Sequence, residues 1–191
     1  MNEKPMSDKK MSEEKKMVEG FESPINLRYN FAAGRATSSF LRGIQQGKIL
    51  GHRSSVTGKV TVPPRGADPE TGTPTTEEVL LPETATVCSF TIVHIPIPNA
   101  AVQPPFVVAN MVFDNADQTF IHLISEIPND QVRIGMKVKA VWRDSSEWAL
   151  TMDNIKYFVP TGEPDIDVQE LKSQRLKETA TFNKSEKSRN A

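Results

Sequence analysis

Hydrophobic and polar residues alternate most regularly within residues 84–114. In the first half, Cys88, Phe90 and Ile92 alternate with Ser, Thr and Val residues, the period-two pattern of a strand with one face on a core. The second half is apolar at nearly every position, which predicts a strand buried on both faces. The proline-rich connection 95–105 interrupts strand pairing, because proline has no N–H to donate. This stretch therefore predicts a bent β-hairpin.

The same period-two pattern predicts two more strands, at 118–124 and 137–143, and residues 148–158 supply a fifth strand. In the second of these, Lys and Arg face outward while Val, Ala and Trp face inward. A bulge is expected at Asp153-Asn154. His122, inside the strand 118–124, is interpreted as a barrel histidine with its hydrogen bonds satisfied. With the hairpin, these strands predict a partly open, five-stranded Greek-key barrel.

One amphipathic helix is predicted between Thr37 and Leu50. Its apolar residues recur at helical spacing, Thr37 or Ser38 can act as the N-cap, and Gly47 or Gly51 can end it. The composition of the flanking segments then divides the chain. The expected parts are a disordered tail (1–22), an extended arm with the helix (23–51), a ribbon (52–82), the barrel (83–160) and a C-terminal tail (161–191).

Composition limits what else the chain can contain. With 191 residues, of which 37% are hydrophobic and 25% charged, it can hold one modest core with attached pieces. A net charge of -1 predicts no field strong enough to gather nucleic acid. No apolar run approaches the roughly 18 residues of a membrane span, and the Lys-rich start lacks a signal-peptide core, so a cytoplasmic location is expected. The lone cysteine fits that reducing compartment.

The segment 51–72 has the outline of a zinc ribbon without its cysteines. Two turn sequences, Ser54-Ser-Val-Thr57-Gly and Asp68-Pro-Glu-Thr71-Gly, stand where a ribbon has two Cys-x-x-Cys-Gly knuckles. The four ligand positions hold the hydroxyls of Ser54, Thr57 and Thr71 and the carboxylate of Asp68, so no thiolate is present. The single neighbouring imidazole, that of His52, does not replace four thiolates. The sequence predicts no zinc and a ribbon held by turns, side-chain hydrogen bonds and packing.

Several motifs occur in a fixed order between about Thr37 and Asp165. Besides the knuckle outline, they are Phe40-Leu-Arg-Gly-Ile-Gln-Gln-Gly-Lys-Ile-Leu-Gly, Val62-Pro-Pro-Arg-Gly, Ser89-Phe-Thr-Ile-Val-His-Ile-Pro, Pro104-Pro-Phe-Val-Val-Ala, Val132-Arg-Ile-Gly-Met-Lys-Val and Pro160-Thr-Gly-Glu-Pro. In this order they resemble the acyl-CoA-associated OB-fold family, first catalogued as domain of unknown function thirty-five, which has a rubredoxin-like zinc ribbon before the barrel. The missing cysteines depart from the pattern of that family.

The resemblance implies a mainly β fold and a role beside an enzyme. Members of the family are non-catalytic partners of thiolase-superfamily enzymes, including acetyltransferases, acyl-CoA thiolases and the thiolase-like aldolases of steroid side-chain breakdown. The expected role is therefore an accessory subunit that stabilises such a complex and helps it to handle acyl-CoA, in lipid or aromatic degradation. Expected partners are the thiolase-like enzyme and its acyl-CoA, without nucleic acid or membrane.

Four residues are candidate contacts for acyl-CoA or for the partner. His94 ends the first barrel strand beside the proline-rich loop, where a ligand could lie at the barrel mouth. Arg53, Lys59 and Arg65 on the ribbon carry charges that suit phosphates. The alternative for His94 is a strand-end histidine that caps a loop carbonyl. The alternative for each of the three ribbon cations is a solvated surface charge.

Five apolar residues lack an obvious place in the barrel core and are candidate partner contacts. They belong to the arm, the helix and the ribbon edge, and neighbouring arginines could form a polar rim around them. The alternative for the arm aromatics is that they fold back on their own barrel. The five are Tyr29, Phe31, Phe40, Val60 and Val62.

No catalytic constellation is recognisable in the sequence. The chain has one cysteine and three histidines, and none forms a known nucleophile–base motif. Two other hypotheses stay open. A nucleic-acid-binding OB module would need a basic, aromatic-rich groove. An autonomous acyl-CoA hydrolase or transferase would need turnover by the purified chain.

Overall fold

The computed structural model describes residues 20, 25, 27, 32–96 and 102–173. The chain divides into two units, 1–32 and 33–191, and the fold below belongs to the second. Nearly all of the predicted N-terminal tail lies outside the described residues, and so do Tyr29, Phe31 and residues 174–191 of the predicted C-terminal tail.

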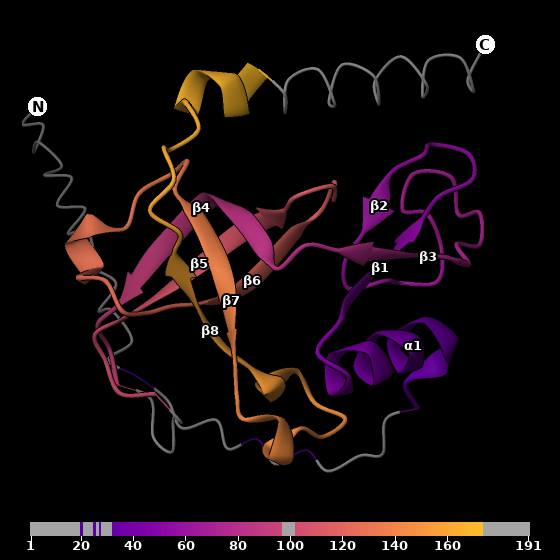
Figure 1. The fold of residues 1–191 in the computed structure, drawn as a ribbon, viewed down its shortest axis with the longest axis horizontal. Coiled ribbons are helices and arrows are strands. Elements are labelled where there is room, and N and C mark those ends of the chain that lie inside the picture. Colours follow the sequence, from indigo (N-terminus) through magenta and orange to yellow (C-terminus); the bar gives the residue numbers. More distant parts are fainter. Residues whose placement is uncertain (1–19, 21–24, 26, 28–31, 97–101, 174–191) are drawn as a thin grey trace, which may run out of the picture. The chain divides into compact units, whose positions relative to one another are not determined.

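Five strands form a closed barrel in the second unit (Figure 1). Their order around the barrel is β4-β5-β6-β8-β7, and β7 pairs back onto β4. All ladders are antiparallel except that between β6 and β8, which meet at the single pair Ile124 and Phe158. This is the Greek-key barrel of an OB-fold, as predicted. The strands are β4 (Thr84–Val93), β5 (Phe106–Phe113), β6 (Thr119–Ile124), β7 (Lys137–Trp142) and β8 (Ile155–Pro160).

Three phenylalanine rings occupy the middle of the barrel. The ring centroid of Phe113 lies 5.1 Å from that of Phe120 and 5.7 Å from that of Phe158. In β5 only alternate residues, from Val107 to Phe113, are fully buried, and the others are half-buried. The expectation that β5 is buried on both faces was therefore wrong. Its outward face is covered only in part, and residues of the C-terminal segment lie beside Asn110 and Val112 on that face.

A bulge interrupts β4 at Cys88. The pairing of β4 with β5 shifts register between Val87 and Ser89. Cys88 is consequently half-buried, and its thiol donates to the Thr86 carbonyl at 3.6 Å. The predicted inward-facing core thiol is therefore corrected, because the extra residue turns this side chain away from the barrel centre.

The last strand begins later than predicted, at Ile155, because two short turns occupy the segment before it. The side chain of Asp144 accepts from the Ser146 N–H and caps the 3-10 helix Ser145–Glu147. Thr151 caps the 3-10 helix Met152–Asn154 in the same way. A third 3-10 helix, Asn129–Gln131, precedes β7. Side-chain capping thus occupies 153–154, and the expected bulge lies slightly later, between Ile155 and Tyr157, where the pairing of β7 with β8 shifts register.

The helix α1 (Gly34–Gln45) begins three residues before the predicted start. Its N-cap is Ala33, so no Ser or Thr side chain caps it, whereas Gly47 ends it with a positive φ as predicted. The apolar pair Ile49-Leu50 belongs to a strand instead of the helix. Capping preferences indicate that a helix starts nearby, but they do not fix the residue.

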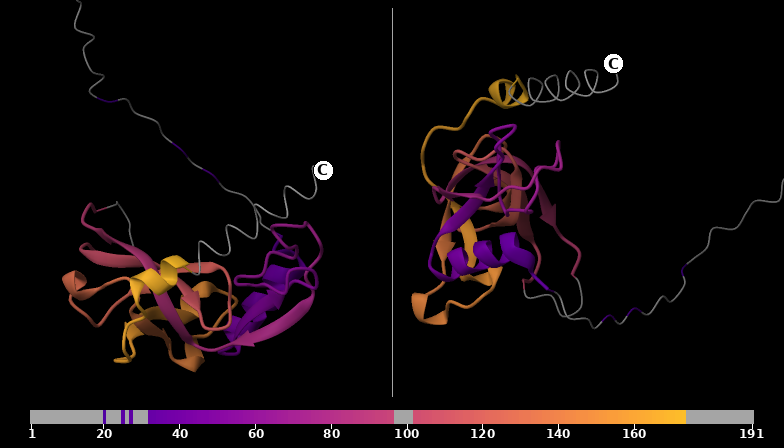
Figure 2. Two further views of the ribbon diagram at one scale, coloured as in Figure 1. Left: turned by 90° about the horizontal axis from the view of Figure 1, so that it is seen from above. Right: turned by 90° about the vertical axis from the view of Figure 1, so that its right-hand side faces the viewer.

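Three strands form a small antiparallel sheet beside α1, in the order β2-β1-β3. They are β1 (Ile49–Arg53), β2 (Val60–Thr61) and β3 (Glu77–Leu81). The helix packs on β1, and two further views show it lying beside the barrel (Figure 2). One hydrophobic core runs through the helix, this sheet and the barrel.

The described beginning of the C-terminal tail is attached to the barrel. Ile166 N–H donates to the carbonyl of Gly135 at 2.9 Å. Arg133 forms an ion pair with both carboxylate oxygens of Asp165. A tail that starts at 161 and is wholly mobile was therefore the wrong expectation for residues 161–166.

Candidate functional site

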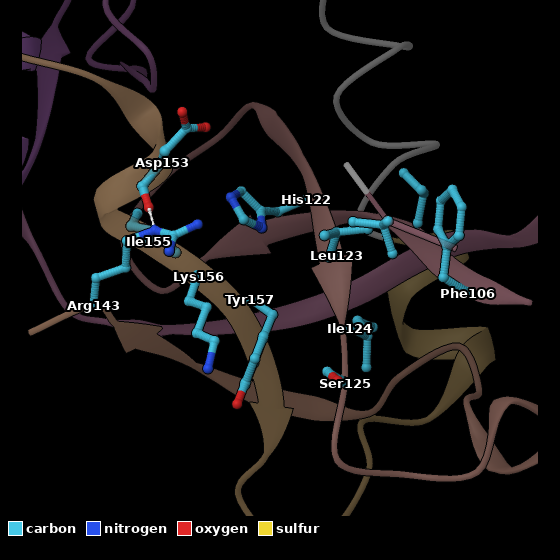
Figure 3. A pocket seen from close by; sticks show the side chains of 12 residues that line it. Phe106, His122, Leu123, Ile124, Ser125, Arg143, Asp153, Ile155, Lys156 and Tyr157 are labelled. Atoms are coloured by element: carbon cyan, nitrogen blue, oxygen red, sulfur yellow. Dashed lines mark hydrogen bonds between the residues drawn. The ribbon is translucent and has the colours of Figure 1, made fainter. Parts of the chain in front are cut away.

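A pocket of about 510 Å3 lies where β6 and β8 come together. These strands share a single bridge, between Ile124 and Phe158. Strands β5 and β6 contribute Phe106, Val108 and His122 to the pocket, and β8 contributes Ile155 and Tyr157 (Figure 3).

The pocket occupies the position at which OB-folds bind ligands. Such folds use the face of their second and third strands together with the loops that join strands one and two and strands four and five. Here these elements are β5, β6, the loop 94–105 and the loop 143–154. Both loops reach the pocket, the first through Val102 and the second through Arg143 and Asp153.

His122, a half-buried residue of β6, lines this pocket. Its ring lies parallel to that of Phe120, with centroids 5.9 Å apart, and edge-on to Phe158 at 5.6 Å. Nδ1 is buried and has no hydrogen-bond partner among the described residues. Burial lowers the pKa of His122 below 6.5, partly offset by the Leu123 backbone and the Asp153 charge. The lowered pKa favours the neutral ring at neutral pH. The expectation that the hydrogen bonds of His122 are satisfied stays a prediction, because the Leu123 backbone is one partner of this side chain.

The mouth of the pocket carries two cations. Nε of Arg143 donates to the backbone carbonyl of Asp153 at 2.6 Å, whereas the Asp153 carboxylate points away from Arg143 (Figure 3). The Lys156 ammonium lies 5.1 Å from the ring centroid of Tyr157. The Tyr157 hydroxyl donates to the Glu126 carboxylate, and this bond raises the pKa of Tyr157.

The two knuckle sequences fold as tight turns of the kind that surrounds a zinc ion. In the first, Gly58 N–H donates to the Ser54 carbonyl at 3.0 Å, and the Ser54 hydroxyl accepts from the N–H of Thr57 at 3.1 Å. In the second, Gly72 N–H donates to the Asp68 carbonyl at 2.9 Å. Both glycines have a positive φ, as the outline predicted.

Asp68 joins the two turns. Its Oδ2 accepts from the Thr57 hydroxyl at 2.7 Å, and its Oδ1 accepts from the N–H groups of Glu70 at 2.8 Å and Thr71 at 3.2 Å. The residue is only 2% exposed. Burial raises its pKa, but hydrogen bonds from Ser54, Thr57 and the backbone outweigh burial and lower the pKa to about 2.

This arrangement does not fit a zinc ion. The four positions hold hydroxyls and one carboxylate whose two oxygens already accept hydrogen bonds. The described residues contain no cluster of three or more His, Cys, Asp or Glu that could hold a metal. His52 does not act as a zinc ligand through Nδ1, because this nitrogen donates to the Thr75 carbonyl at 2.9 Å.

The four residues predicted to contact acyl-CoA or the partner do not form one site. Arg53 bonds within the ribbon, to Glu77 at 3.1 Å and to a backbone carbonyl, and Lys59 pairs with Glu70. Arg65 and His94 are exposed. None of the four lines the pocket between β6 and β8.

Three of the five predicted interface residues are buried in the core. Phe40 and Val60 are 2% exposed and Val62 is fully buried, so the premise that they lack an internal place was wrong. The reason is that the helix and ribbon share a core with the barrel, which the sequence pattern does not reveal. Tyr29 and Phe31 lie outside the described residues and stay a prediction.

Polar contacts join the ribbon and helix to the barrel, and sequence reasoning missed them. Asp117 Oδ2 accepts from Val60 N–H at 2.7 Å, and Asp117 N–H donates to the Val60 carbonyl at 2.9 Å. The buried Asn154 amide donates to the carbonyls of Ile44 and Ala149.

The pocket residues in 143–154 could have been found from the OB-fold rule, because they belong to the loop between the last two barrel strands.

The fold and the pocket define an OB-fold protein with an attached helix and a ribbon lacking zinc ligands. Comparison with known proteins also indicates an OB-fold. Residues 78–143 match the family described as the C-terminal OB-fold domain of ChsH2, which confirms the predicted family over most of the barrel. No curated protein sequence matches the chain.

Two solved structures are similar to the chain. One, described as the Ltp2-ChsH2(DUF35) aldolase, is 21% identical with a TM-score of 0.52, and covers 69% of this chain and 98% of the matched chain. Another, a protein of unknown function from the DUF35 family of Sulfolobus solfataricus, is 25% identical with a TM-score of 0.48, and covers 56% and 78%. The first likeness shows the fold.

Within the described part of the chain, no helix has the length and apolar character to cross a membrane.

Proposed function

We propose that the chain is a non-catalytic accessory subunit of a thiolase-superfamily enzyme, of the acyl-CoA thiolase, acetyltransferase or thiolase-like aldolase type. The observation that carries this proposal is the match of residues 78–143 to the OB-fold domain of ChsH2. The name of the similar solved structure joins ChsH2 with Ltp2 in an aldolase, which supports an aldolase subunit as the partner. The role is to stabilise the complex and to contact its acyl-CoA, in the cytoplasm.

The positions of the reactive side chains support a non-catalytic role. Covalent catalysis needs a nucleophile within hydrogen-bond reach of a base. Cys88 lines two pockets beside the C-terminal segment, whereas His122 lines the pocket between β6 and β8. The thiol donates to a backbone carbonyl instead of an imidazole. The described residues thus offer no thiol and imidazole in one pocket.

Nucleic-acid binding is the second candidate, because the pocket lies on the face that OB-folds use for single strands. Phe106 and Tyr157 could stack with bases, and Arg143 and Lys156 carry suitable charges. The net charge of -1 and the acidic Glu126 bound to Tyr157 weigh against it.

Co-expression tests the proposed function. The full-length chain, carrying an affinity tag, is expressed together with the proteins encoded by its genomic neighbours, and also alone, and a thiolase-like protein is sought among those that co-purify. We expect the two proteins to co-purify at a fixed ratio, and acyl-CoA turnover to require the enzyme and to rise with this chain. Turnover by the isolated chain that one substitution within it abolishes would overturn the proposal, as would failure of the two proteins to associate.

A further inference from the structure

We propose that residues 165–173 form a hinged strap, which covers part of the outer face of β4 and β5 and lifts from it while the barrel stays folded. This inference goes beyond the proposed function, because it concerns a movement within this chain alone. It does not depend on which enzyme is the partner, or on whether there is one.

One end of the strap is anchored to the turn that precedes β7. Gly135 N–H donates to the Val87 carbonyl of β4 at 2.8 Å, and the Gly135 carbonyl accepts from Ile166 N–H at 2.9 Å. An added Cβ at Gly135 would lie 2.1 Å from the Ile166 carbonyl oxygen, so only glycine allows the two backbones to approach this closely. Nη2 of Arg133 donates to Oδ1 of Asp165 at 2.9 Å, and this ion pair completes the anchor.

The rest of the strap lies against the part of β4 that carries Cys88. Residues 168–173 are helical (yellow in Figure 1), and the Asp167 side chain caps them by accepting from Gln169 N–H at 2.7 Å. Leu171 lines two cavities, of about 280 and 470 Å3, and Cys88 lines both of them as well. The two side chains therefore lie together at the boundary of these cavities, where Leu171 covers Cys88.

The strap is held more weakly than the strands beneath it. Within 165–173 only Ile166, Val168 and Leu171 are half-buried, and the other residues are exposed. In β4, by contrast, Val87 is fully buried. The ion pair of the anchor is exposed and contributes only about 0–1 kcal/mol. Segments with few buried apolar contacts open at a lower free energy than the core does, so the strap should open by itself.

Residues 162–164 supply the hinge. Thr161 N–H donates to the Lys137 carbonyl at 3.0 Å, which fixes the chain to β7 just before this point. The three hinge residues are exposed, and an added Cβ at Gly162 would have open space around it. Backbone rotation at 162–164 can therefore move the strap without disturbing a buried contact. Lifting would uncover Cys88 and the β4–β5 surface next to it.

The single cysteine of the chain reports on the strap. Alkylation of Cys88 by a bulky maleimide dye is timed with the full-length protein, under native conditions and in concentrated urea. We expect the native thiol to react at least about tenfold more slowly than the unfolded one, because the dye reaches it only while the strap is lifted.

Two substitutions free the strap at different points, each with a matched control. Leu171→Ala removes the side chain that covers Cys88 and should raise the alkylation rate by about fivefold or more. Gln169→Ala, at an exposed residue of the same helix, should leave the rate unchanged. Asp165→Ala removes the ion pair and should raise the rate by about two- to threefold, whereas Glu163→Ala, at an exposed carboxylate outside that pair, should not.

Salt and hydrogen exchange test the anchor and the independence of the movement. High salt should speed alkylation of the unchanged protein but not of Asp165→Ala, because salt screens an exposed ion pair. In the unchanged protein, the amides of residues 169–171 should exchange faster than those of β4, since the strap opens without the barrel.

Four results would overturn the proposal. A native thiol that reacts as fast as the unfolded one, or a Leu171→Ala variant that reacts no faster than Gln169→Ala, would show that the strap does not cover Cys88. A rate that neither Asp165→Ala nor salt changes would remove the anchor. Strap amides that exchange as slowly as those of β4 would show that the strap opens only when the barrel unfolds. All four are measured on the isolated chain, so they decide the strap separately from the co-expression result.

Discussion

Replacing Asp68 should destabilise the ribbon more than replacing any exposed carboxylate. Its carboxylate stands where a zinc ribbon has a thiolate, and it receives hydrogen bonds from both knuckles. The change Asp68→Asn keeps the shape of the side chain and removes the charge. It also places an NH2 group where one oxygen now accepts a hydrogen bond.

The pKa of Asp68 gives the size of the effect. It falls from the usual 3.8 to about 2, a difference of about 1.8, and each pKa unit corresponds to about 1.36 kcal/mol. The ionised group therefore stabilises the folded state by about 2 kcal/mol. Because the folded pKa is the lower one, this stability is present above pH 3.8 and is lost as the pH falls toward 2.

Urea unfolding at a series of pH values measures the effect. At pH 7 Asp68→Asn should lower the free energy of unfolding by about 2 kcal/mol or more, and the difference from the unchanged protein should shrink between pH 5 and pH 2.5. Asp130→Asn, at an exposed residue, is the control and should change stability by less than about 0.5 kcal/mol. A strong chelator should not alter the melting temperature of the unchanged protein, since no zinc is expected.

Two results would refute this reasoning. If Asp68→Asn were as stable as the unchanged protein at pH 7, the carboxylate would not hold the knuckles together. If elemental analysis found one zinc per chain, or the chelator unfolded the protein, a metal would take the role assigned to Asp68.

Three further predictions concern the core, the helix end and the buried histidine. Phe40→Ala should cost about 3–5 kcal/mol in urea unfolding, because Phe40 is buried in the core; a stable variant that only lost its partner would restore the interface interpretation. Gly47→Ala should cost about 2 kcal/mol or more in the same assay, since its new Cβ would lie 2.6 Å from the Trp148 ring; Gly58→Ala, with the same sign of φ and open space, should cost only about 1 kcal/mol. The folded pKa of His122 is lowered, so stability should fall as the pH drops below 6.5, and His122→Phe should flatten this part of the pH profile; an unchanged profile would contradict the assignment.

The sequence alone determined the elements whose signals are local. The period-two pattern placed β4, β6 and β7 to within a few residues, because alternation shows directly which face of a strand is apolar, and a continuous apolar run placed β5. The glycines of the two knuckles indicated tight turns with positive φ. The residue types at Ser54 and Asp68 excluded a thiolate site without any structure. The ordered motifs indicated the family that residues 78–143 then matched.

Only the tertiary structure decided which of these elements share a surface. Alternation shows that a strand has an apolar face but does not show what covers it, so Phe40 and Val62 were assigned to an interface although they lie in the core. The pocket is lined by residues of β5, β6 and β8, which are brought together by contacts between segments far apart in the sequence. The place of His122 against the rings of Phe120 and Phe158 could not be predicted for the same physical reason: the surroundings of a buried side chain depend on distant neighbours, and no local pattern records them.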